Sequence, residues 1–176
     1  MHEVKRVWKA APVVQMESLP TLPMLKSAVL EAILTRLDAE LETLTRGARA
    51  SFAAATDPDS KAENKYDTRT LEASYVARGQ AQRVTEVQAA RHQYAALQMA
   101  ASDMIRLGSL VELEIAGHSD HYFIGPSEGG LEIIVEGREI LLITPASPLG
   151  ARLMGKTVAE RITLPSGQQG SVKNIG

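Results

Sequence analysis

The stretch from residue 25 to residue 66, LKSAVLEAILTRLDAELETLTRGARASFAAATDPDSKAENKY, decides the fold of this chain. Its first part carries apolar residues at alternating spacings of four and three, the pattern of a helix that packs along a coiled-coil seam. The seam positions are Leu30, Leu34, Leu37, Leu41, Leu44 and Ala48. They predict a helix that extends to about residue 55 and, at about 1.5 Å per residue, forms a rod of roughly 45 Å.

A break follows at Thr56-Asp57-Pro58-Asp59, because a proline disfavours the helical conformation of the residue before it. A second helix can begin with Asp59 or Ser60 as its N-cap, and Ser60 with Glu63 forms a capping box. Its predicted seam runs through Leu71, Tyr75, Val84, Val87, Tyr94, Leu97, Ala101 and Met104. Two long helices joined by so short a break fold back on each other. The prediction is an antiparallel hairpin over residues 24–107.

The apolar period changes to two after Gly108, which predicts β-strands. Apolar residues alternate with glutamates from Val111 to Ile115, and later apolar runs are separated by Gly, Pro or Ser turns. One short helix from about Pro148 to Met154, ended by Gly155, interrupts the strands. The predicted fold class is therefore α+β, with a helical hairpin followed by a small antiparallel β domain over residues 108–176.

Composition excludes several classes of protein. Hydrophobic residues make up 44% of the 176 residues and the net charge is -2, which is typical of a folded chain. The absence of cysteine excludes disulfides, thiolate catalysis and Cys-ligated zinc. No apolar run approaches the roughly 20 residues that span a bilayer, so we expect a cytoplasmic protein without a membrane partner. Near-neutral charge also argues against tight independent DNA binding. Residues 1–23, with three prolines and no sustained period, are expected to be extended or partly ordered.

Two motifs at separate places in the chain resemble one family. The first is Ser147, Pro148, Leu149 and Gly150, followed by Leu-Met-Gly-Lys at residues 153–156. The second is the acidic stretch DPDSKAENKY at residues 57–66, which is similar to a tip motif written Gly-Asp-x-x-Glu-Asn-x-x-Tyr. Both are features of the Gre transcript-cleavage factors of bacterial RNA polymerase. The resemblance implies a coiled-coil hairpin with an acidic tip and an FKBP-like C-terminal domain.

The resemblance also implies a function. The β domain would dock on the polymerase through Ser147, Pro148, Leu149 and Gly150, while the hairpin enters the secondary channel. There Asp59 and Glu63, with Asp57 as a third candidate, would stimulate cleavage of backtracked RNA by the polymerase active site. Carboxylates suit Mg²⁺, which keeps several waters and takes only one or two carboxylates from a surface. The Mg²⁺ would be shared with the polymerase, the RNA 3′ end would be approached indirectly, and the factor would be no enzyme on its own.

The tip leaves alternatives open. Aligning Glu63-Asn64 with the family's Glu-Asn places Ser60 where the family has Asp, whereas aligning Asp59 and Tyr66 with the family's Asp and Tyr puts Ala62 and Glu63 out of step with Glu-Asn. In either register the spacing from Asp59 to Glu63 is four rather than three. Both spacings keep two side chains on one face of a helix. Because the spacing departs from that of the family, an inhibitor or regulator that enters the channel without stimulating cleavage remains an alternative. So does a generic coiled-coil interaction module, in which the acidic residues only cap a turn and favour a helix N-terminus.

Other residues have a functional and a structural interpretation. The basic residues near the tip could touch RNA or an acidic channel wall, although solvated coiled-coil faces explain them more simply. They are Lys61, Lys65, Arg69, Arg78 and Arg83. His118 and His121 fall in a predicted hairpin loop without a third metal ligand, so a solvated turn is the better interpretation. Ser147 can cap the short helix after it, which explains the same turn without any partner.

Overall fold

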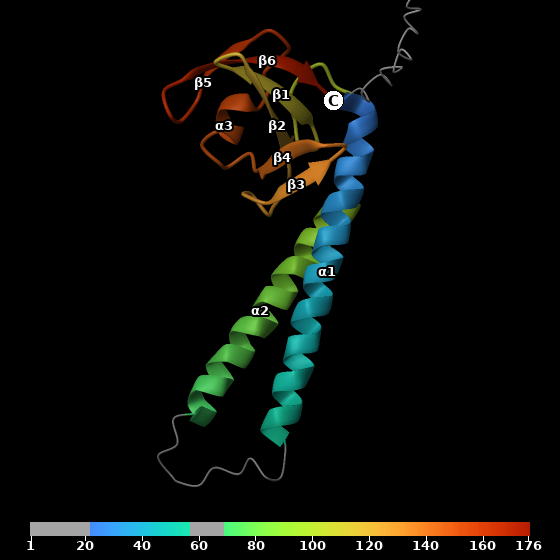
Figure 1. The fold of residues 1–176 in the computed structure, drawn as a ribbon, viewed down its shortest axis with the longest axis vertical. Coiled ribbons are helices and arrows are strands. Elements are labelled where there is room, and N and C mark those ends of the chain that lie inside the picture. Colours follow the sequence, from blue (N-terminus) through green and yellow to red (C-terminus); the bar gives the residue numbers. More distant parts are fainter. Residues whose placement is uncertain (1–21, 57–68) are drawn as a thin grey trace, which may run out of the picture.

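The computed structural model describes residues 22–56 and 69–176, and its first part is the predicted helical hairpin. Helix α1 (Leu22–Thr56) and helix α2 (Arg69–Ala95) run antiparallel along each other (Figure 1). Fully buried apolar side chains recur on one face of each helix. They are Leu25, Val29, Ile33 and Leu37 on α1 and Val87, Ala90 and Tyr94 on α2. The hairpin expected from the apolar spacing is confirmed.

The buried face of α1 coincides with the predicted seam only in part. Leu37 is fully buried, whereas Leu30, Leu34, Leu41 and Leu44 are only partly buried and pack around the core. The reason is that α1 packs against the β domain as well as against α2, so its apolar stripe is shared between two neighbours. The predicted seam position Tyr75 is 67% exposed, because the two helices separate towards their distal ends (Figure 1).

Helix α2 ends earlier than the apolar spacing predicted. Its last residue is Ala95, so the predicted seam positions Leu97, Ala101 and Met104 lie in a non-helical connection. Leu97 still packs against the core of the hairpin. Met104 instead forms an isolated antiparallel bridge with Thr157, which fixes the connection to the β domain.

The β domain is one six-stranded sheet in the order β3-β4-β2-β1-β6-β5. Its elements are β1 (Leu110–Ile115), β2 (His118–Ile124), β3 (Glu132–Val135), β4 (Arg138–Ile143), α3 (Gly150–Leu153), β5 (Arg161–Thr163) and β6 (Gln169–Ile175). The predicted α+β class is confirmed, but the sheet is mixed rather than wholly antiparallel. The β3–β4 hairpin joins the sheet through β4, which pairs with β2. The β2–β4 pair is parallel, and all other strand pairs are antiparallel.

Two tight turns fix the register of the hairpins in this sheet. Ala116 and Gly117, with φ values of 51° and 84°, join β1 to β2, and Glu136 and Gly137, with 51° and 72°, join β3 to β4. Positive φ at both central residues matches the twist of the flanking strands. His118, expected in a loop, is therefore the first residue of β2, because the turn takes only two residues.

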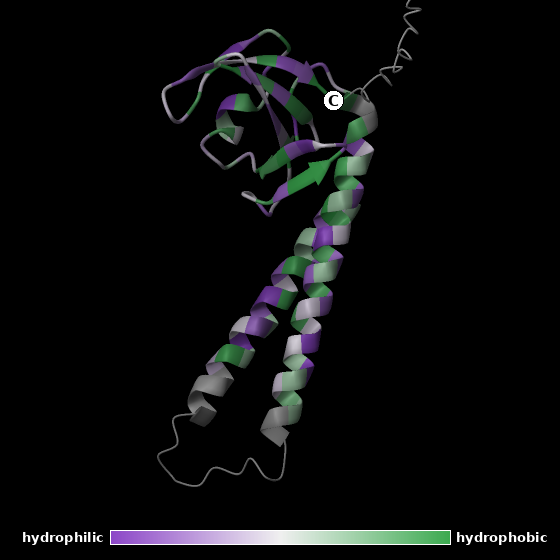
Figure 2. Cartoon of the chain, in the orientation of Figure 1, coloured by the Kyte–Doolittle hydropathy of each residue, from purple (hydrophilic) through white to green (hydrophobic). Residues whose placement is uncertain are grey.

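The sheet has two apolar faces with different partners. One face, which includes Leu110, Phe123 and Leu142, shares a single core with α1 and α2. The other face, which includes Val111 and Val172, packs on Leu153 of α3 together with other residues of a second core. Figure 2 shows the apolar strand β3 lying beside α1. The hairpin base and the sheet therefore form a continuous structure rather than two loosely tethered parts.

Across residues 22–56 and 69–176, no helix combines the length and the apolar character needed to cross a membrane.

Candidate partner-binding surface

The turn between β4 and α3 is built by Ser147. Its backbone N–H and its hydroxyl both donate to the carbonyl oxygen of Thr144, at 3.0 and 2.8 Å. Its hydroxyl oxygen in turn accepts the N–H of Gly150 at 3.0 Å, and its carbonyl accepts the N–H of Ala151 at 2.9 Å. Ser147 thus satisfies a free amide at the start of α3, as helix-capping residues do. The N-cap position of α3 is however Leu149, which has no side-chain cap, so Ser147 supports the start of the helix from two residues before that position.

Gly150 is required in this turn by close packing. A Cβ atom added to it would lie 2.0 Å from the carbonyl oxygen of Thr144 and 2.9 Å from the Ser147 hydroxyl. Backbone atoms cannot move aside cheaply, so a larger residue would open the turn. Gly150 acts through shape and is itself buried.

The exposed part of the turn is Pro148. Leu149 is half-buried and packs against the core beneath α3, and Ser147 is half-buried by its hydrogen bonds. Pro148 is exposed and fixes the backbone of the turn. Of the four residues predicted to bind a partner, Pro148 is thus the one whose side chain is free to be contacted, and the other three hold it in place.

The end of α3 is tied to the connection after α2. Helix α3 ends at Leu153 with Met154 as its C-cap, one residue before the predicted Gly155. Gly155 follows with a φ of 77°, and its N–H donates to the carbonyl oxygen of Ile105 at 2.8 Å. The N–H of Ile105 donates to the backbone carbonyl oxygen of Lys156 at 2.8 Å. This pairing leaves three exposed apolar side chains on neighbouring backbone, namely Met104, Met154 and Val158, with 53%, 37% and 51% exposure.

The acidic tip lies outside the described residues. Asp57, Asp59 and Glu63 fall in the segment that the structure does not describe, as do Lys61 and Lys65. The described ends of the two helices, Thr56 and Arg69, lie at the end of the hairpin remote from the sheet (Figure 1). The carboxylates predicted to act on RNA are thus connected to the far end of the rod, while the Ser147 turn belongs to the β domain at its other end.

Arg83 links the hairpin to the β domain. Its guanidinium donates to Glu40 of α1 at 2.9 Å and to Glu128, in the loop after β2, at 3.1 Å. The hydrogen bonds to Glu128 and Glu40 raise the pKa of Arg83 further above its ordinary value. From the sequence, the basic residues near the tip, Arg83 among them, could be either solvated helix residues or contacts to RNA or a channel wall. The structure instead places Arg83 between two carboxylates, and nothing in the local spacing indicated a partner 45 residues away.

Tyr94 forms a second link at the same loop. Its side chain is fully buried, its ring lies 6.5 Å from that of Phe123, and its hydroxyl donates to the carbonyl of Ser127 at 2.7 Å. Burial raises the pKa of Tyr94, so the hydroxyl stays protonated as a donor. Gly125 leaves the space that this hydroxyl fills, because an added Cβ would lie 2.0 Å from it. The loop at residues 125–128 thereby sets the direction of the hairpin.

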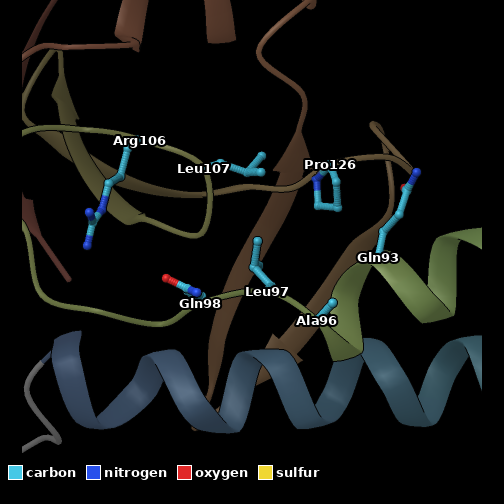
Figure 3. Close-up of a pocket in the computed structure, with 7 residues that line it drawn as sticks. All are labelled: Gln93, Ala96, Leu97, Gln98, Arg106, Leu107 and Pro126. Carbon is cyan, nitrogen blue, oxygen red and sulfur yellow. The ribbon is translucent and has the colours of Figure 1, made fainter.

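A shallow hollow of about 450 Å³ lies where α2 ends (Figure 3). Leu97, Leu107 and Pro126 supply apolar surface and Gln93 and Gln98 supply amides. Arg106 lines it too, but its guanidinium already donates to the carbonyls of residues 100 and 101 at 2.8 and 3.1 Å. The lining contains no carboxylate, histidine or hydroxyl, so the hollow offers no group for acid–base or nucleophilic chemistry.

The two histidines of the sequence motif are separated by strand geometry. His121 lies opposite Glu112 on the neighbouring strand, and burial lowers its pKa. Over the described ranges, no three His, Asp or Glu side chains lie close enough together to hold a metal ion. The predicted solvated turn is wrong, because both residues belong to strand β2, where His118 is exposed and His121 is half-buried.

Comparisons with known proteins give structural similarities alone. No family model matches the chain, and no curated protein matches it significantly. Among solved structures, the GreA factor homolog 1 (Gfh1) of Thermus thermophilus is 23% identical with a TM-score of 0.34, covering 82% of this chain and 95% of that chain. Gfh1 of Thermus aquaticus is 21% identical with a TM-score of 0.34, covering 82% and 94%. Similarities at this level carry no weight for function, which is inferred below from the residues of this chain.

Proposed function

We propose that this chain is a Gre-like elongation factor that binds the secondary channel of bacterial RNA polymerase and stimulates Mg²⁺-dependent cleavage of backtracked RNA. The observation that supports the proposal is that the Ser147 turn belongs to the β domain, whereas Thr56 and Arg69, which flank the acidic motif in the sequence, end the helices at the far end of the rod (Figure 1). Helix α1 has 35 residues, which corresponds to a length of about 50 Å. A factor of this shape can hold the rim of a channel with one end and reach a buried active site with the other.

Docking is assigned to the turn at residues 147–150. Ser147 and Gly150 hold the turn before a partner arrives, so little conformational freedom is lost on binding. Pro148 offers an exposed apolar contact. The loop at residues 125–128 fixes the hairpin relative to this turn through Arg83 and Tyr94. Docking of the turn would therefore also direct the hairpin into the channel.

Asp59 and Glu63, with Asp57 as a third candidate, would act at the far end of the rod. Their carboxylates are suited to join a Mg²⁺ whose other ligands come from the polymerase. Such an ion, when bound, polarises a phosphate and activates water. The cleavage reaction would remain that of the polymerase, and contact with the RNA 3′ end would be indirect.

A second candidate function follows from the spacing at the tip. The Asp59-to-Glu63 spacing of four, where the Gre motif has three, favours a factor that occupies the channel without stimulating cleavage. Such a protein would compete with other channel-binding factors and inhibit the enzyme. The docking turn and the rod serve both functions equally, so only activity at the tip distinguishes them.

The test is a cleavage assay on stalled, backtracked complexes with the full-length chain. Asp59→Asn and Glu63→Gln keep side-chain shape but remove charge, so binding to polymerase should persist while stimulation falls by at least about tenfold. Wild-type stimulation should also be lost when the divalent ion is withdrawn. If the wild-type chain binds but never accelerates cleavage at any Mg²⁺ concentration, the inhibitory function takes the place of the activating one.

Docking is tested separately with Pro148→Ala, because Pro148 is the exposed residue of the turn. Its matched control is Pro165→Ala, which removes an exposed proline elsewhere in the β domain. We expect weaker polymerase binding for the first variant only, with unchanged circular dichroism for both. Equal binding of both variants would remove the turn from the interface. The whole chain is needed, because the sheet shares its core with the hairpin.

A further inference from the structure

The charges of the β domain are unevenly distributed. Residues 108–176 contain eight carboxylates and five Lys or Arg residues, so the domain as a whole is acidic. Three of the five cations nevertheless gather around one shallow hollow of about 400 Å³ between α3 and β5. They are Arg152, Lys156 and Arg161. With Glu160 as the one neighbouring carboxylate, the cluster carries a net charge of +2 on a domain that is otherwise negative.

Two of these cations are held in place by the protein itself. The guanidinium of Arg152 donates to the backbone carbonyl of Thr163. The Lys156 ammonium donates to Glu160 at 2.9 Å, and that carboxylate also accepts the N–H of Thr157 at 2.7 Å. Because these side chains are already ordered, a ligand would lose less conformational entropy in binding them.

Arg161 differs from its two neighbours. It lies exposed on the edge strand β5, and within the described part of the chain its guanidinium makes neither a hydrogen bond nor an ion pair. Beside it, Ile162 is 5% exposed and belongs to the second core, so the hollow has an apolar floor. A guanidinium without a protein partner and an apolar residue that line the same hollow suit a ligand with both a carboxylate and an apolar group.

We propose that the hollow formed by Arg152, Lys156, Arg161 and Ile162 is a docking surface for an acidic peptide segment of a partner protein. The peptide's carboxylates would pair with the Arg161 and Arg152 guanidiniums, and an apolar side chain of the peptide would rest on Ile162. Recognition would occur through side chains rather than by addition of a strand to β5, because Arg152 already occupies the outward carbonyl of Thr163.

A peptide fits this surface better than a nucleic acid. No aromatic side chain lines the hollow, so it offers no platform for base stacking. A long phosphate backbone would also cross the acidic remainder of the domain, where carboxylates outnumber cations seven to two once the cluster and Glu160 are set aside. A short acidic segment meets only the local positive charge.

The partner assignment rests on the proposed function, since the hollow adjoins α3, the helix that the docking turn enters. On that basis the acidic segment belongs to the polymerase rim, and Arg161 adds an electrostatic contact to the apolar one from Pro148. The chemistry of the surface itself does not depend on this assignment, and the two are tested by separate measurements.

The surface is tested by fluorescence anisotropy with a labelled glutamate-rich peptide that contains one leucine, titrated with the full-length chain. Binding should weaken at high ionic strength. Arg161→Gln should weaken it several-fold, and the charge reversal Arg161→Glu at least about tenfold, or about 1.4 kcal/mol. Arg138→Gln is the control, because it removes a cation on β4, which lies four strands away from β5 in the sheet, and it should change the dissociation constant less than about twofold.

Three outcomes would overturn the surface proposal. They are absence of peptide binding by the wild-type chain, an equal loss for Arg138→Gln and Arg161→Glu, and tighter binding of an oligothymidine than of the peptide. The partner is tested by binding the same variants to core polymerase. If the wild-type chain does not bind polymerase while the peptide results hold, the proposed function fails and the surface stands. If polymerase binds wild type and Arg161→Glu equally, the function stands and the hollow lies outside that interface.

Discussion

The contact between Tyr94 and Gly125 allows a double-mutant test of how the hairpin is joined to the β domain. An added Cβ at Gly125 would lie 2.0 Å from the Tyr94 hydroxyl and 3.0 Å from the ring carbon that carries it. Gly125→Ala alone therefore forces the loop and the helix apart. Tyr94→Phe removes the hydroxyl that causes the worst overlap, so the two substitutions should not act independently.

The magnitudes follow from the geometry. Gly125→Ala should lower the free energy of unfolding by about 1–3 kcal/mol, the usual effect of overpacking a filled site. Tyr94→Phe should cost about 1 kcal/mol through loss of the 2.7 Å hydrogen bond to Ser127. In the double variant the remaining 3.0 Å contact needs only a small shift. Its loss should therefore fall short of the sum of the single losses by about 1 kcal/mol.

The assay is urea unfolding of all four proteins, followed by circular dichroism for the helices. The three variants should keep the far-ultraviolet spectrum of the wild type before the transition. If the loss in the double variant equals the sum of the two single losses within about 0.3–0.5 kcal/mol, the two sites do not contact each other. The loop at residues 125–128 would then not hold the hairpin as the structure indicates.

Two further predictions concern the hairpin core and the sheet. Leu37→Ala, at a fully buried position, should lower the free energy of unfolding by about 2–5 kcal/mol in urea melts. The control Val76→Ala, at a side chain that is 58% exposed, should lower it by less than about 0.5 kcal/mol. Similar losses for the two variants would contradict the packing of the hairpin. Burial raises the pKa of Glu112, but hydrogen bonds from Asn174 and Ser119 outweigh it, so the folded pKa lies below the ordinary 4.5. The ionised Glu112 carboxylate then stabilises the fold above pH 4.5. This stabilisation is lost as the pH falls through the pKa of Glu112 in the folded protein. Glu112→Gln should lose less stability on acidification below pH 4.5 than the wild type, and parallel acid-unfolding curves would refute this.

The candidate site could be predicted only in part from the sequence. Serine before proline indicated a helix cap, and Ser147 does accept the N–H of Gly150, the first residue of α3, although the N-cap position is Leu149. That Pro148 is exposed while Gly150 is buried depends on how α3 lies on the sheet. The link from Arg83 to Glu128 and the gathering of Arg152 with Arg161 join residues distant in sequence. No local pattern carries such information.

Local sequence patterns were sufficient to determine the two long helices, the change to strands after Gly108 and, to within one residue, the end of the short helix α3. The reason is that apolar spacing and the conformational limits of proline and glycine act within a few residues. Three features were decided by the tertiary structure: α2 ends at Ala95, β4 runs parallel to β2, and the sheet shares its core with α1. Each depends on which apolar face meets which partner, and that choice is made by packing between segments far apart in the chain.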